Sequence, residues 1–259
     1  MNAMNWVGAS GRRLSVVALA GLVLALAAGA LALFAALGYR TGALELGTSF
    51  SFLRWGARTG LAALAVSFVG LVLTVVRGRG GPLDDLAPGV AAGVLALAIG
   101  AVSYAIPAEQ QSIARSVPPI HDITTDMENP PAFVDILPLR ADAPNPPEYD
   151  PEIASQQREG YPDLGPIILE EPPDAAFERA LSAVDALGWE LVADDAGAGR
   201  IEATDTTFWY GFKDDVVVRI RPDGNGSRID VRSKSRVGGS DVGANAARIR
   251  TFAERLTGG

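Results

Sequence analysis

The chain has 259 residues, one histidine, no cysteine and a formal net charge of −8. Without cysteine it has no thiolate catalysis, no disulfide scaffold and no zinc site with cysteine ligands. The acidic charge argues against nucleic acid as a partner, because nucleic-acid binding depends on cationic contacts to phosphate. Hydrophobic residues make up 48% of the chain and charged residues 20%, so the apolar residues must be concentrated in one part of it.

Three apolar runs are each long enough to cross a hydrocarbon layer of about 30 Å, which takes about 20 helical residues. They cover residues 14–37, 57–76 and 86–106, and the single charge inside them is Arg58, at the edge of the second run. Buried helices of a soluble domain would show a polar face, and a cleaved signal peptide would have a shorter core than the first run. We therefore predict that residues 1–107 form an all-α membrane region of three transmembrane helices in a lipid bilayer.

The orientation of these helices rests on the arginines that flank them, because positive charges are retained in the cytoplasm. The count is equal on the two sides, and the first helix, directly preceded by Arg12 and Arg13, usually dominates. We therefore expect a multi-pass protein of the bacterial inner membrane with its C-terminal domain in the periplasm. The two groups of arginines are Arg12, Arg13, Arg77 and Arg79 on one side and Arg40, Arg54, Arg58 and Arg115 on the other.

Residues 108–173 hold most of the 17 prolines together with many acidic residues. Because proline breaks helices and central strands, this part is predicted to be an acidic linker, and residues 142–152 (DAPNPPEYDPE) should be stiff, extended and solvated. The exception is the stretch IHDITTD at residues 120–126, whose β-branched residues favour an extended strand. We expect segment 120–133 to dock on an edge of the sheet that follows.

Residues 174–259 carry the pattern of an α+β domain: a helix, a four-stranded antiparallel sheet and a second helix. In the second hairpin, one register places apolar residues opposite apolar residues and charges opposite counter-charges. That register pairs Ile220 with Ile229, Val218 with Val231, Arg219 with Asp230 and Asp215 with Lys234. The expected helices cover residues 174–187 and 241–256, and the expected strands cover 189–193, 200–204, 214–221 and 228–236.

The polar face of this hairpin is a basic stripe in an otherwise acidic protein. The stripe can hold a phosphate or carboxylate, and the glycine-containing loop that follows leads into a helix amino terminus, where free N–H groups favour anions. The alternative is that aspartates, the acidic linker and the helix cap occupy these groups. The stripe comprises Arg219, Arg221, Arg228, Arg232, Lys234 and Arg236, and the candidate ligand-binding residues are Arg219, Arg232, Arg236, Gly239, Ser240 and Asp241.

The stretch TTFWYGFKDD at residues 206–215 packs four aromatic residues around Gly211. We expect alternate rings to face the core beneath the helices. Two alternatives remain, ligand stacking and an interfacial membrane anchor made by Trp209 and Tyr210.

Three blocks of the chain resemble a bacterial family, the domain of unknown function DUF1499. They are IHDITTDMENPPAF, FWYGFKDDVVVRIRP and SRIDVRSKSRVGGSDVGANAARIRTF, and they match in order between Ile120 and about Leu256. The resemblance implies a membrane-linked envelope protein and brings no established activity. It also implies that the segment around His121 belongs to the domain and not to its tether.

His121 admits three interpretations. A metal site would join it to Asp122, Asp126 or Glu128, and a hydrolase would use it as the general base for Ser235 or Ser240. Neither pattern is accompanied by an established motif such as HExxH or GxSxG. The interpretation we prefer is a histidine that hydrogen-bonds the docked segment to the domain.

Two functions follow from these patterns. The preferred one is a non-enzymatic envelope protein whose periplasmic domain binds an anionic ligand, a lipid or an envelope protein, with no cofactor and no metal. The alternative is a periplasmic hydrolase or metal-dependent enzyme that uses His121 with Asp122 or Asp126.

Overall fold

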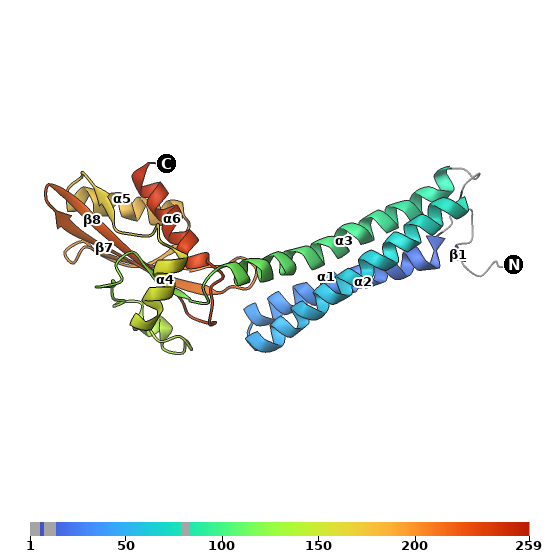
Figure 1. The fold of residues 1–259 in the computed structure, drawn as a ribbon, viewed down its shortest axis with the longest axis horizontal. Coiled ribbons are helices and arrows are strands. Elements are labelled where there is room, and N and C mark those ends of the chain that lie inside the picture. Colours follow the sequence, from blue (N-terminus) through green and yellow to red (C-terminus); the bar gives the residue numbers. More distant parts are fainter. Residues whose placement is uncertain (1–5, 8–13, 79–82, 259) are drawn as a thin grey trace. The chain divides into compact units, whose positions relative to one another are not determined.

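The computed structural model describes residues 6–7, 14–78 and 83–258. It divides into two compact units, Met1–Gln111 and Ser112–Gly259, which are treated separately below. Figure 1 shows the course of the chain and the labels of its helices and strands.

The first unit contains three helices, each long and apolar enough to cross a membrane. All three extend beyond the apolar runs of the sequence, and α3 continues through Pro107 to the polar residues that follow it. A short antiparallel pair of strands precedes them. The elements are β1 (Trp6–Val7), β2 (Leu14–Ser15), α1 (Val16–Arg40), α2 (Leu46–Gly78) and α3 (Leu83–Ser116), whose last residues belong to the second unit.

Small residues make the contacts between these helices. A Cβ atom added to Gly70 of α2 would lie 2.6 Å from the Cα atom of Ala18 in α1, and one added to Gly60 would lie 3.0 Å from the carbonyl oxygen of Gly100 in α3. Large apolar side chains such as Val23 and Phe68 point outward instead. Close approach through glycine and alanine, with large side chains outside, is typical of helices packed within lipid.

The second unit is an α+β domain built on an antiparallel sheet, as predicted. The sheet has six strands and not the four expected, in the order β3-β8-β7-β6-β5, with β4 also paired to β8. Its strands are β3 (Asp122–Thr124), β4 (Ile167–Leu169), β5 (Glu190–Asp195), β6 (Arg200–Thr206), β7 (Lys213–Asp223) and β8 (Gly226–Ser235). Its helices are α4 (Ala154–Gly160), α5 (Pro173–Ala186) and α6 (Ala244–Thr257), with 3-10 turns η2 (Leu137–Arg140) and η3 (Pro151–Ile153).

The two additional strands come from the part predicted to be a linker. Both pair with the outer edge of β8, β3 along Arg232–Lys234 and β4 along Ser227–Ile229. Three-residue strands fit between the prolines, so proline density did not prevent them. The prediction that the segment around Ile123 adds to a sheet edge is confirmed, and so is the register of the β7–β8 hairpin, including Ile220 opposite Ile229.

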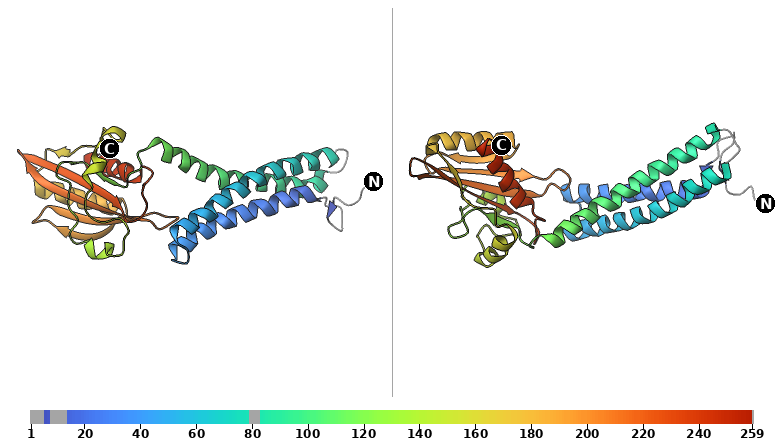
Figure 2. Two further views of the ribbon diagram at one scale, coloured as in Figure 1. Left: turned by 60° about the horizontal axis from the view of Figure 1, so that its bottom comes forward. Right: turned by 45° about the horizontal axis from the view of Figure 1, so that its top comes forward.

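The two faces of the sheet are covered differently. Helices α5 and α6 pack on one face (Figure 2), where Val218 and Val231 join Phe252 in the main core. The other face is covered by residues 126–149, called here the covering segment, which has no regular structure except η2. Within it Phe133 and Ile136 pack on Val217 of β7.

The covering segment corrects the expectation of a solvated linker. The Asn145 amide nitrogen donates to the carbonyl oxygen of Arg236 at 3.1 Å, and its side chain donates to the carbonyl oxygens of Ser235 and Gly238. Proline lacks an amide hydrogen but keeps its carbonyl oxygen as an acceptor, and Arg232 of β8 donates to the carbonyl oxygens of Pro131 and Pro147. An acidic, proline-rich stretch therefore becomes ordered on the sheet.

The aromatic stretch between β6 and β7 also differs from the prediction. Phe208 is 79% exposed and Trp209 is 64% exposed, so these two rings do not lie in the core. They lie in the loop that connects β6 to β7. The core beneath the helices is filled instead by the alternating residues of β7, such as Val216 and Ile220.

Candidate functional site

The covered face of the sheet is a network of buried ion pairs. Arg232 makes a two-pronged contact with Asp122, with Nε 2.8 Å from Oδ1 and Nη2 2.7 Å from Oδ2. Lys234 binds the same carboxylate at 2.9 Å. Both cations also donate to carbonyl oxygens of the covering segment, at Pro147 and Glu148. The Asp122 carboxylate thus joins β3 to β8 and to the segment in front of them.

A second buried carboxylate, Asp215 of β7, binds two arginines. Arg236 contacts both of its oxygens at 2.8 Å, and Arg140 of the covering segment forms an ion pair with it in which both side chains are almost fully buried. Glu202 of β6 completes the attachment, since its carboxylate accepts the amide hydrogens of Val134 and Ile136 at 2.8 Å. The covering segment is therefore held by charges along its length.

At the hairpin end of the same face, three arginines share two aspartates. Arg219, Arg221 and Arg228 all contact Asp230, which is fully buried, and all three also lie within 3.6 Å of Asp126. This group has one more positive than negative charge. It is also the most open part of the stripe, because the side chains of Arg221 and Arg228 are 40% and 35% exposed.

The carboxylate of Asp126 stays ionised within this group. Burial opposes its ionisation, but hydrogen bonds from the backbone amides of Asn129 and Glu128 and the charges of Arg228 and Arg219 hold its pKa below the ordinary value. Of the three arginines in this group, Arg219 also lines a cavity.

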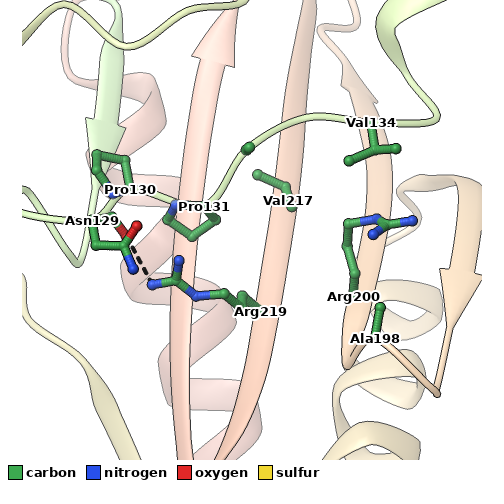
Figure 3. A pocket seen from close by; sticks show the side chains of 9 residues that line it. Asn129, Pro130, Pro131, Val134, Ala198, Arg200, Val217 and Arg219 are labelled. Atoms are coloured by element: carbon green, nitrogen blue, oxygen red, sulfur yellow. Dashed lines mark hydrogen bonds between the residues drawn. The ribbon is translucent and has the colours of Figure 1, made fainter.

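This cavity has a volume of about 260 Å³ and lies between the covering segment and strands β6 and β7. Figure 3 shows its two arginines on neighbouring strands, with Arg219 beside Pro131 and Arg200 beside Val134. Arg200 and Arg219 are direct partners in the β6–β7 register. The lining residues are Asn129, Pro130, Pro131, Ala132, Val134, Ala198, Arg200, Val217 and Arg219.

The charged side chains in the lining of the cavity are both arginines. The carboxylates that pair with them lie outside the lining: Asp126 and Asp230 pair with Arg219, and Asp135, Asp195 and Glu202 pair with Arg200. Arg219 donates through Nη2 to the carbonyl oxygen of Asn129 at 2.9 Å. Its Nε atom is buried and has no hydrogen-bond partner among the residues that the structure describes. An unpaired buried donor is costly unless a ligand or a water accepts from it.

The structure separates the six predicted ligand-binding residues into three places. Arg219 lines the cavity. Arg232 and Arg236 lie under the covering segment, with side chains 3% and 14% exposed and bound to carboxylates. Both arginines are therefore already engaged in ion pairs inside the domain.

Gly239, Ser240 and Asp241 lie at the opposite end of β8, ahead of α6. The Asp241 carboxylate accepts from the amides of Gly243 and Asn245 at 2.8 and 2.9 Å, so the cap itself occupies the N–H groups that would have held an anion. The helix begins at Ala244, three residues later than expected. This end of β8 therefore offers no anion site of the predicted kind.

The three candidate catalytic residues do not come together. Asp122 faces the covered side and is bound to Arg232 and Lys234, whereas Asp126 is at the hairpin end with Arg219. The backbone oxygen of His121 accepts from the Ser235 amide at 3.0 Å. No group of three His, Asp or Glu side chains suited to a metal occurs within residues 6–7, 14–78 and 83–258.

The hydroxyl groups proposed for a hydrolase are engaged elsewhere. Ser235 Oγ accepts from the Asn245 side-chain amide at 3.0 Å, and Ser240 Oγ accepts from the Val242 amide at 3.2 Å. The Asn245 amide also donates to the His121 carbonyl oxygen. These contacts use the backbone of His121 to dock the segment before β3 on the domain.

Sequence reasoning missed Arg200 and the prolines that form the wall of the cavity. Arg200 is the single basic residue of β6 and therefore does not belong to a basic stripe. Its position opposite Arg219 follows only from the β6–β7 register. A register test of that hairpin is the signal that would have found it.

The titration of His121 gives a testable prediction. Burial, and then the charge of Lys234, lower its pKa, against the opposing effects of Asp122, the Gly239 backbone and Asp241. The unfolded chain therefore takes up a proton more readily than the folded one, and the free energy of unfolding should decrease as the pH falls below the ordinary value of 6.5. Urea unfolding at about pH 7.5 and pH 5.5 measures this change. It is followed by Trp189 fluorescence in a background in which Trp6, Trp55 and Trp209 are replaced by phenylalanine.

The matched variant is His121→Gln, which should fold and should lose most of the pH dependence in this range. The pKa of Asp126 is lowered from its ordinary value of 3.8, so this group titrates outside the range. An equal pH dependence in the wild type and the variant would show that His121 is not the titrating group.

Comparison with known proteins places the second unit in a family. Residues 122–256 match the model of the family described as protein of unknown function, DUF1499. A search of curated proteins found no match. The matched region contains all six strands of the sheet, the covering segment and the arginine-lined cavity, and it makes up more than half of the chain. The chain therefore belongs to the DUF1499 family.

Proposed function

We propose that this protein is a membrane-anchored binding protein whose C-terminal domain holds a small anionic ligand in the cavity between Arg200 and Arg219. The observation that carries the proposal is the lining, in which both charged residues are arginines and one guanidinium Nε has no partner among the described residues. Guanidinium groups recognise carboxylates and phosphates through paired N–H donors.

The other lining residues and the size of the cavity indicate what the uncharged part of the ligand should be. Pro130, Pro131, Val134 and Val217 supply apolar contacts opposite the arginines. At about 260 Å³, the cavity is smaller than the sites of drug-sized molecules, which take about 300–1,000 Å³. A small organic anion with a short apolar part, such as a carboxylate or a phosphate monoester, fits this description.

We further propose a location in the bacterial inner membrane, with the domain in the periplasm. Three helices place the two ends of the chain on opposite sides of the membrane. The arginines directly before the first helix, Arg12 and Arg13, favour a cytoplasmic amino terminus.

Anion binding can be tested by thermal unfolding of the full chain in detergent. Inorganic phosphate and acetate, each compared with chloride at equal ionic strength, represent the two head groups. At least one should raise the melting temperature, because a ligand at one hundred times its Kd stabilises the folded state by about 2.7 kcal/mol. The rise should disappear in Arg219→Gln and in Arg200→Gln.

The control is Arg221→Gln. Arg221 binds the same Asp230 as Arg219 but does not line the cavity, so this variant should keep the rise in melting temperature. No response to either anion, or the same response in all three variants, would contradict the proposed site.

The orientation can be tested with a single cysteine in this cysteine-free chain. Asn225 is exposed at the tip of the β7–β8 hairpin, so Asn225→Cys should react with a membrane-impermeant thiol reagent. Labelling in intact cells, equal to that after lysis, is the expected result. Labelling only after lysis would place the domain in the cytoplasm.

A further inference from the structure

Strand β5 is the last strand of the sheet and has a partner strand on one side only. It pairs with β6 from Glu190 to Asp195, and its backbone makes no hydrogen bond to any further element among the residues that the structure describes. The N–H and C=O groups of an antiparallel strand point alternately to its two sides, so about half of those in β5 face outward. The sheet is therefore open to a further strand at this edge.

The opposite edge of the sheet, at β3, is closed by a side chain. Gln157 of α4 donates through Nε2 to the Thr124 carbonyl oxygen at 2.6 Å, and its Oε1 accepts from the Thr124 amide at 3.1 Å. A side-chain amide offers the same donor and acceptor as a peptide group, and Gln157 is fully buried. It takes the place of a neighbouring strand at this position, whereas no residue does so at β5.

The exposed side chains of β5 form an apolar centre between acidic ends. Leu191 is 46% exposed, and Glu190, Asp194 and Asp195 beside it are all exposed. Asp195 lies 3.5 Å from Arg200. The side chains of Glu190 and Asp194 have no hydrogen-bond or ion-pair partner in the described parts of the chain. Each end of the strand thus presents a carboxylate that can pair with a cation.

This pattern disfavours a second copy of the chain as the partner strand. Antiparallel pairing of two β5 strands brings Glu190 of each copy beside Asp194 and Asp195 of the other, and like charges opposite each other destabilise a pair of strands. The strand also contains a register shift between Leu191 and Ala193. Charges and bulges at an edge are devices that prevent self-association. The same carboxylates attract a strand of opposite charge.

We propose that β5 binds an extended segment of a partner protein, with basic residues on both sides of an apolar centre, as a further strand of the sheet. In this mode of recognition the main-chain hydrogen bonds supply affinity and the side chains supply specificity. Lysine or arginine beside Glu190 and Asp194 forms cross-strand ion pairs, and an apolar side chain covers Leu191. An acidic segment is rejected by the same charges.

The experiment uses the full chain in detergent and a fluorescent peptide of about seven residues, close to the length of a typical strand. The peptide alternates valine and threonine between a lysine at each end. Fluorescence anisotropy should show saturable binding, and a peptide with glutamate in place of lysine should bind about tenfold more weakly or worse. Amide hydrogen exchange should slow in residues 190–195 when the lysine peptide is bound, because strand addition covers the outward N–H groups.

The matched variants each reverse two exposed charges. Glu190→Lys combined with Asp194→Lys removes the carboxylates of β5, and should weaken binding of the lysine peptide about tenfold and strengthen binding of the glutamate peptide. The control, Glu178→Lys combined with Glu254→Lys, makes the same change in net charge on the exposed sides of α5 and α6 and should bind as the wild type does. Circular dichroism checks that both variants fold.

Three results would overturn the proposal. Absence of binding, or equal binding of the lysine and glutamate peptides, would show that β5 does not select a basic strand. Binding without slower exchange in residues 190–195 would mean a purely ionic contact. Slow exchange of β5 that depends on protein concentration, without any peptide, would mean that a second copy covers the edge. None of these results bears on anion binding at Arg219, which lies two strands away in the sheet.

Discussion

Buried ion pairs between β8 and the residues in front of it hold the C-terminal domain together. Asp122, Asp215 and Asp230 are almost fully buried, and each binds at least two cations from β7, β8 or the covering segment. A buried charge without a partner is strongly destabilising, so none of these groups can lose its partners at small cost. The covering segment must therefore lie on the sheet in the folded state, although it has almost no regular structure.

This constraint also decides where a ligand can bind. Most cations of the basic stripe form ion pairs with carboxylates inside the domain. Arg232 and Arg236 stabilise the fold in this way. The hairpin end carries the most exposed arginines of the stripe, Arg221 and Arg228. There Arg219 lies opposite Arg200 of the neighbouring strand at the cavity. The opposite end of the sheet carries the aromatic loop and the chain that leads to α3.

The helices and most strands could be predicted because the spacing of apolar residues along the sequence indicates them. The three apolar helices, the β7–β8 register with Val218 opposite Val231, and the strand at Ile123 all follow from which side chains need burial. The covering segment could not be predicted, since its attachment depends on carbonyl oxygens such as that of Pro147, which have no sequence signature. Arg219 could be identified as a candidate because it belongs to the basic stripe. Arg200 could not, because its position opposite Arg219 on the neighbouring strand depends on the pairing of β6 with β7.

The central claim is that the ion pairs of β8 keep the covering segment in place, and amide hydrogen exchange of the full chain tests it most directly. Asp122→Asn leaves two buried cations without their counter-charge, a loss of about 3–5 kcal/mol. The account predicts faster exchange at Val134 and Ile136 while α5 stays protected, and no change in Asp163→Asn, whose ion pair with Arg250 is exposed. Unchanged exchange of the covering segment in Asp122→Asn would contradict it.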